Sequence, residues 1–191
     1  MAMTGGVAWG QVKSAMYGNL TIGVDGTTVT GAFYDARPGN GTEDAPQFSC
    51  LFLLRGTVEG AANGPTAVTA WTPLGKATTA GTLTIEKETV KLHLDGDPPG
   101  CAATGDEFAS SPYEDTSVLD GKWTSVRVVS ADNAAVRQAP VSGSSAQSRL
   151  SKGDVVVVYR RIGAWLEAKN LNARRPVRGW VRESDLEPDQ P

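Results

Sequence analysis

The chain has 191 residues, a formal charge of −3, 40% apolar residues and 22 glycines, a composition typical of a globular protein rich in strands and turns. Its longest apolar run, 155–159, is far too short to cross a bilayer, so the sequence predicts no membrane span. Residues 1–6 contain neither a basic segment nor an apolar core, so we expect that a signal peptide was never present or was already removed.

Charge is unevenly distributed along the chain. Residues 1–122 carry a net charge of −7, whereas residues 123–191 carry +4. This asymmetry favours two domains, 7–122 and 124–188, which have different partners or attract one another. The negative total charge argues against a nucleic-acid partner.

The first predicted elements form a β-hairpin. Runs 17–24 and 27–34 both alternate apolar with small or polar residues, and Asp25-Gly26 between them is a typical hairpin turn. Within the hairpin, the pattern Gly-x-Leu-x-Ile, a turn and Val-x-Gly-x-Phe is similar to strands of the avidin and calycin β-barrels.

Further strand signals follow at short intervals. Residues 47–56 form the most apolar strand of this part, and 66–71 forms a strand that ends before Pro73. In 81–87 and 89–94 the apolar residues recur with a period of two, which predicts strands with one buried face. We therefore expect an antiparallel meander, either closed into a barrel or folded as a sandwich.

Cys50 lies in a predicted strand and Cys101 in a loop rich in Gly and Pro. A metal site would need three or four ligands, and a nucleophilic cysteine would need a histidine base, but the only histidine, His93, lies in a separate strand. The pair favours a disulfide, and with it an oxidising compartment, so we expect a periplasmic or secreted protein. The alternative is two reduced, buried cysteines that pack as small hydrophobes.

Four short motifs follow one another in the last third of the chain. They are Ala135-Val136-Arg137 with Pro140, Lys152-Gly153-Asp154 before an apolar strand, Gly163-Ala164-Trp165, and Gly179-Trp180-Val181 with Leu186. In this order and spacing they resemble the bacterial SH3 (SH3b) family, apart from Ala135, where the family often has asparagine, and a basic insertion at 169–178. The resemblance implies a second small barrel, so the expected class is all-β: an N-terminal antiparallel meander plus a C-terminal SH3-like barrel.

The resemblance also implies a binding role without enzyme activity. We expect a non-catalytic, exported binding protein of the bacterial cell envelope that recognises cell-wall peptide, including peptidoglycan, or an envelope protein. The alternative is a periplasmic inhibitor or immunity protein that blocks a secreted wall-degrading enzyme with the acidic loop 95–107. No nucleophile and base can be assembled from the sequence, so we expect no catalytic residues, no cofactor and no metal.

The candidate ligand-binding residues combine aromatic rings with arginines. They are Tyr159, Trp165, Arg174, Arg175, Arg178 and Trp180. Aromatic faces offer contact area to flexible peptides at a small entropic cost, and arginine forks bind carboxylates in a bidentate manner. The alternatives are that both tryptophans belong to the core and that the arginines form a solvated face, which docks on the acidic first domain.

Overall fold

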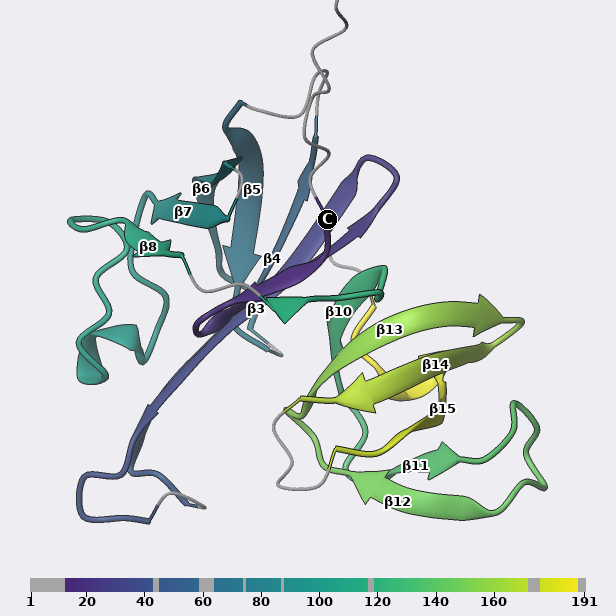
Figure 1. The fold of residues 1–191 in the computed structure, drawn as a ribbon. Coiled ribbons are helices and arrows are strands. Elements are labelled where there is room, and N and C mark those ends of the chain that lie inside the picture. Colours follow the sequence, from purple (N-terminus) through teal and green to yellow (C-terminus); the bar gives the residue numbers. More distant parts are fainter. Residues whose placement is uncertain are drawn as a thin grey trace, which may run out of the picture.

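The computed structural model describes residues 13–42, 45–58, 64–73, 75–86, 88–116, 119–171 and 176–188. These residues form strands, turns and short 3-10 helices, with no α-helix among them. The strands make two sheets, one of nine strands and one of six, which lie side by side (Figure 1). The predicted all-β class is confirmed.

The first sheet is an antiparallel meander in which β1 to β8 pair consecutively and β9 returns to the far edge beside β1. Its strands are β1 (Ala15–Tyr17), β2 (Leu20–Asp25), β3 (Thr28–Arg37), β4 (Phe48–Thr57), β5 (Thr66–Trp71), β6 (Thr78–Glu86), β7 (Thr89–Leu94), β8 (Tyr113–Asp115) and β9 (Leu119–Asp120). The turn that joins β2 to β3 is Gly26-Thr27, one residue later than the predicted Asp25-Gly26, because Asp25 pairs with Thr28 at the end of β2. Gly26 adopts a left-handed φ of 57°.

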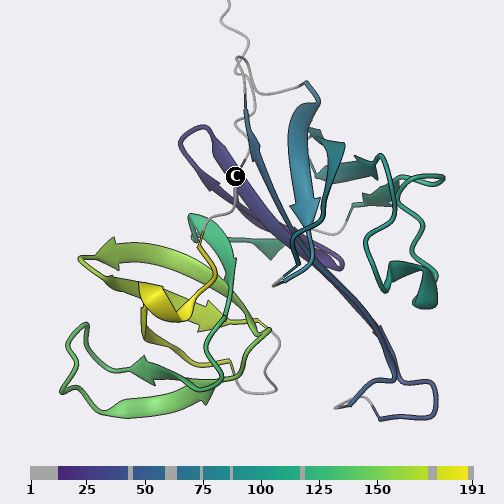
Figure 2. The same cartoon turned by 180° about the vertical axis from the view of Figure 1, so that it is seen from behind.

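The sheet curls strongly (Figures 1 and 2). One side chain joins β8 to the β1–β2 turn. The Tyr113 hydroxyl at the start of β8 donates to the carbonyl of Tyr17 at 2.8 Å and accepts from the amide of Asn19 at 3.1 Å. Gly18 lies between these two residues with a φ of 54°, and a Cβ there would meet the Tyr113 hydroxyl at 2.7 Å. A tyrosine hydroxyl therefore holds β8 against the β1–β2 turn.

Aromatic rings fill the core of the first sheet. Phe33 and Phe52 face inward from β3 and β4 with centroids 5.3 Å apart, and Phe108 packs edge-on against both. Beside them, Cys50 and Cys101 form the predicted disulfide, and both residues are buried. This bond ties the long loop between β7 and β8 to β4.

The hairpin of β3 and β4 continues past the rest of the first sheet as a two-stranded arm. β3 pairs with β4 along its whole length, whereas β4 pairs with β5 only from Leu53 onward. Figures 1 and 2 show the arm projecting away from the body of the molecule. The described part of the arm's tip, between β3 and β4, is rich in Gly, Pro and Asn.

The second sheet has the order β10-β13-β14-β15-β11-β12. Its strands are β10 (Ser125–Val128), β11 (Ala134–Arg137), β12 (Ala146–Leu150), β13 (Val155–Ile162), β14 (Trp165–Asn170) and β15 (Arg178–Arg182). Its apolar core consists mainly of aliphatic side chains, such as Val156, Leu166 and Val181. Trp165 and Trp180 are not members of this apolar cluster.

The two sheets share a third apolar cluster where β10 crosses the outer surface of β2 and β3. The members from both sides are Ala32, Leu53, Trp71, Trp123, Val126, Val128, Val155 and Val157. Trp123 Nε1 donates to the carbonyl of Ile22 at 2.8 Å, and the amide of Val126 donates to Thr30 Oγ1 at 2.9 Å. The predicted boundary at 122–124 falls between β9 and β10, and the division into independent domains stays a prediction.

Candidate functional site

The outer surface of β13, β14 and β15 brings most of the predicted ligand-binding residues together. Along β14, residues alternate between half-buried and buried, so Leu166 and Ala168 enter the core while Trp165 and Glu167 face outward. The antiparallel register then sets Trp165 opposite Arg182, and Glu167 opposite Trp180. We call this surface the stacked face; it comprises Tyr159, Arg160, Trp165, Glu167, Arg178, Trp180 and Arg182.

The guanidinium of an arginine stacks on each aromatic ring of the stacked face. The guanidinium of Arg178 lies 3.7 Å from the ring centroid of Tyr159, and that of Arg160 lies 5.0 Å from Trp180. The guanidinium of Arg182 lies 5.0 Å from Trp165. These separations are within the range of cation–π attraction, so the rings hold the guanidinium groups in defined orientations.

Glu167 lies at the centre of this arrangement and joins two of the stacks. Arg160 donates to one carboxylate oxygen at 2.5 Å and Arg178 to the other at 3.0 Å. Burial raises the pKa of Glu167, but the hydrogen bonds from Arg160 and Arg178 outweigh it and hold the pKa below its ordinary value. The carboxylate is thus charged at neutral pH and offsets part of the charge of both arginines.

The predicted ligand-binding residues differ in accessibility. Tyr159 and Trp165 are half-buried and Arg178 is exposed, whereas Trp180 is only 6% exposed beneath Arg160. Arg174 and Arg175 lie outside the described residues. Of the aromatic pair proposed from the sequence, Trp165 therefore offers more ring surface to a ligand than Trp180.

Glu167, Arg160 and Arg182 were not among the six predicted ligand-binding residues. Strict alternation from Val156 and Val158 would direct Arg160 into the core, but the β13–β14 register shifts between Val158 and Arg160. This bulge turns Arg160 outward, opposite Glu167. No pattern in the sequence predicts the bulge, although the charged residues Arg160 and Arg161 at the end of an apolar strand are consistent with it.

The acidic loop 95–107, the candidate inhibitory segment, is held by several internal contacts. The disulfide fixes Cys101, and Asp97 accepts a hydrogen bond from the amide of Ala109 at 3.0 Å. Asp106 accepts from Thr104 Oγ1 at 2.5 Å, and Arg37 on the arm donates to the Thr104 carbonyl at 3.3 Å. The loop is therefore preorganised, and Arg37 and the disulfide hold it to the arm.

Within the part of the chain that the structure describes, no cluster of His, Cys, Asp and Glu side chains could hold a metal ion. No helix among the described residues is long and apolar enough to span a membrane. Comparison of the chain with protein-family models, curated proteins and solved structures found no match.

Proposed function

We propose that this protein is a non-catalytic, exported binding protein of the bacterial cell envelope. In this proposal the C-terminal unit is an SH3b-like module that recognises cell-wall peptide, or an envelope protein, on its stacked face. The observation that supports it most is the set of three arginine–aromatic stacks on one sheet surface. The Cys50–Cys101 disulfide fits an oxidising compartment outside the cytoplasm.

The chemistry of the stacked face suits an acidic peptide. A guanidinium held over a ring still offers N–H donors at its edge, and it loses little conformational freedom when a carboxylate binds there. The side chains of Arg160 and Arg178 remain 61% and 51% exposed although both contact Glu167. Half-buried Trp165 offers contact area to the apolar part of a peptide.

Sedimentation of the full chain with purified peptidoglycan tests this proposal. Arg178→Gln removes one stacked guanidinium, and we expect it to weaken sedimentation about tenfold, since such a contact contributes ~1–2 kcal/mol. Arg149→Gln is the matched control, because Arg149 is an exposed arginine on β12, outside the stacked face. If the full chain does not sediment and binds no envelope protein, or if both variants bind equally well, the proposal is wrong.

A second candidate function, inhibition of a secreted wall-degrading enzyme, is favoured by the preorganised acidic loop. Internal hydrogen bonds and the disulfide hold that loop, so its insertion into a basic cleft would cost little conformational entropy. We expect such an inhibitor to retain one enzyme at high salt and to bury about 1,600 Å². Asp95→Asn, at a side chain 68% exposed, should then weaken capture, whereas Arg178→Gln should not.

A further inference from the structure

A groove runs along the junction between the two sheets, next to the shared apolar cluster. One hollow of about 440 Å³ is lined by both sheets, with Asp25, Thr28 and Arg55 on one side and Arg160 and Arg161 on the other. A second hollow, of about 570 Å³, lies against the end of β15 and the following 3-10 helix, Glu183–Asp185. Both hollows include Arg127 and Glu183, so they adjoin one another. We call them together the seam groove.

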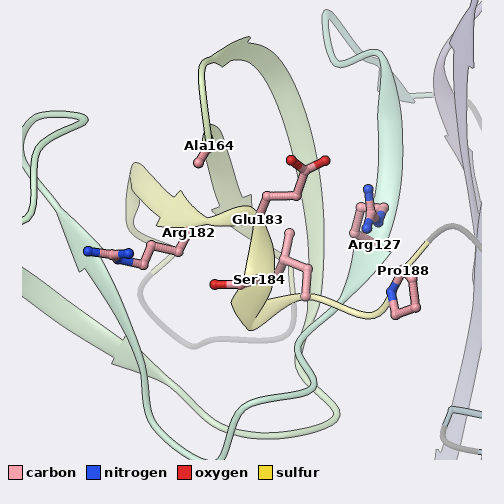
Figure 3. Close-up of a pocket in the computed structure, with 7 residues that line it drawn as sticks. Arg127, Ala164, Arg182, Glu183, Ser184 and Pro188 are labelled. Atoms are coloured by element: carbon pink, nitrogen blue, oxygen red, sulfur yellow. The ribbon is translucent and has the colours of Figure 1, made fainter.

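The second hollow lies beside the C-terminal end of β15. Figure 3 shows Arg127 and Pro188 on one side of it, Arg182 on the other, and Glu183 between them. Because Arg127 and Glu183 also border the first hollow, a chain lying in the groove could extend from β3 to the end of β15.

The charge of the seam groove opposes that of the whole protein. Its described lining contains five arginines (Arg55, Arg127, Arg160, Arg161 and Arg182) and two carboxylates (Asp25 and Glu183). The whole chain, by contrast, has a net charge of −3. A basic groove on an acidic protein concentrates arginine forks, which bind carboxylates in a bidentate manner.

Arg127 and Arg161 of the seam groove are both held by hydrogen bonds, but only Arg161 is widely exposed. Arg127 is 8% exposed and donates to the backbone carbonyl of Glu187, so its charge is fixed in the wall. Arg161 donates to Glu183, yet 63% of its side chain is exposed. Ion pairs at exposed positions are worth only ~0–1 kcal/mol, so a ligand carboxylate can share or replace Glu183 at small cost.

The walls of the groove are fixed relative to one another. Val126 donates to Thr30 Oγ1, and Trp123 donates to the carbonyl of Ile22, which ties β10 to β2 and β3. Gly23 permits the backbone of Ser125 to approach so closely that a Cβ would meet its Cα at 2.6 Å. A groove with preorganised walls binds without the cost of ordering them.

From this geometry we infer that the seam groove is a second binding site, built jointly by both sheets, for an extended acidic peptide segment. Each hollow has the size of a small-ligand site, and the spread of arginines from Arg55 to Arg182 matches several carboxylates along one chain rather than a single small ion. The seam groove adjoins the stacked face, because Tyr159, Arg160 and Arg182 belong to both. Arg55 and Arg161 line only the seam groove, so their variants test this inference separately from the proposed function.

Fluorescence anisotropy with a labelled synthetic hexapeptide of alternating Glu and Gly tests the inference on the full chain. We expect saturable binding with a dissociation constant below about 1 mM. The peptide in which Gln replaces each Glu should bind at least about tenfold more weakly. Arg161→Gln and Arg55→Gln, taken from opposite walls of the groove, should each weaken binding about five- to tenfold. Arg161→Lys keeps the charge but loses the fork, so it should restore part of the affinity.

Arg149→Gln is again the control, because it removes the same charge from β12, which does not line the groove. Thermal unfolding of each variant verifies that it is folded. Three results would overturn the inference: no binding of the Glu peptide to the native protein, equal binding of the Gln peptide, or an equal loss in Arg149→Gln and Arg161→Gln. The last result would mean that the peptide responds only to the overall charge.

Discussion

Glu167 accepts hydrogen bonds from two arginines that are themselves stacked on Tyr159 and Trp180, so one carboxylate connects three strands of the second sheet. Its side chain is only 15% exposed, and solvent therefore screens these interactions less than it screens most surface ion pairs. The same residues that could bind a ligand thus also stabilise each other. If the stacked face binds a ligand as proposed, we expect binding and stability to be coupled at this position.

Replacing Glu167 by Gln should lower the free energy of unfolding by about 1 kcal/mol at pH 7. The pKa of Glu167 in the folded protein lies below its ordinary value of 4.5, so the stabilisation is complete above that pH and is lost as the pH falls through the folded pKa. The deficit of Glu167→Gln should therefore shrink in acid. Urea unfolding of both proteins over a series of pH values measures this.

Glu114→Gln provides the comparison, since Glu114 is 57% exposed and lies 4.0 Å from Lys91. We expect this variant to stay within about 0.5 kcal/mol of the native protein. If the loss of unfolding free energy in Glu167→Gln does not depend on pH, the ion pairs of Glu167 with Arg160 and Arg178 are not its cause.

At the scale of the elements, Tyr113 closes the first sheet where strand pairing does not. Its hydroxyl makes two hydrogen bonds to the β1–β2 turn. Burial, with the Asp115 carboxylate beside it, raises the pKa of Tyr113 to about 12, although the hydrogen bond from Asn19 acts in the opposite direction. The hydroxyl therefore remains a donor throughout the neutral and mildly alkaline range.

Tyr113→Phe should lower the free energy of unfolding by about 1–2 kcal/mol at pH 7, because Tyr17 and Asn19 each lose this partner. The raised pKa contributes stability that is complete below the ordinary value of 10.0 and is lost as the pH rises towards about 12. The deficit of the variant should narrow over that interval in urea unfolding. Tyr34→Phe, at an exposed tyrosine of β3, should change the free energy of unfolding at pH 7 by less than about 0.5 kcal/mol.

At the scale of the whole molecule, the two sheets pack against each other through the shared apolar cluster. The shared cluster buries Trp71 of the first sheet with Trp123 and Val157 of the second part of the chain. The close approach of β10 to β2 depends on the absence of a side chain at Gly23. We therefore expect the two units to unfold together rather than in separate steps.

Gly23→Ala tests this packing directly. Its Cβ would lie 2.6 Å from Ser125 Cα and 2.7 Å from Ser125 C, and backbone atoms in a strand cannot move aside easily. We expect a loss of about 2–3 kcal/mol, measured by urea unfolding. In Gly143→Ala the added Cβ would meet no heavy atom within 4 Å, so this variant should change the free energy of unfolding by less than about 0.5 kcal/mol. Equal losses of stability in the two variants would contradict the close contact at Gly23.

The sequence by itself determined most of the strand pattern and the disulfide, although the β1–β2 turn divides the predicted run 17–24, and β8 and β9 were not predicted. Period-two alternation and turn residues act locally, so β5 and β7 have the predicted bounds, and the β2–β3 turn lies within one residue of the predicted position. Cys50 and Cys101 could be paired because the chain has only these two cysteines.

Only the tertiary structure decided which side chains meet. A bulge at Tyr159 brings Arg160 to Glu167, and the register of β14 with β15 stacks Arg182 on Trp165. The seam groove depends on the packing of two sheets whose strands are far apart in sequence. Local patterns specify which face of a strand is buried, but register shifts and the docking of sheets arise from long-range packing, which no local pattern encodes.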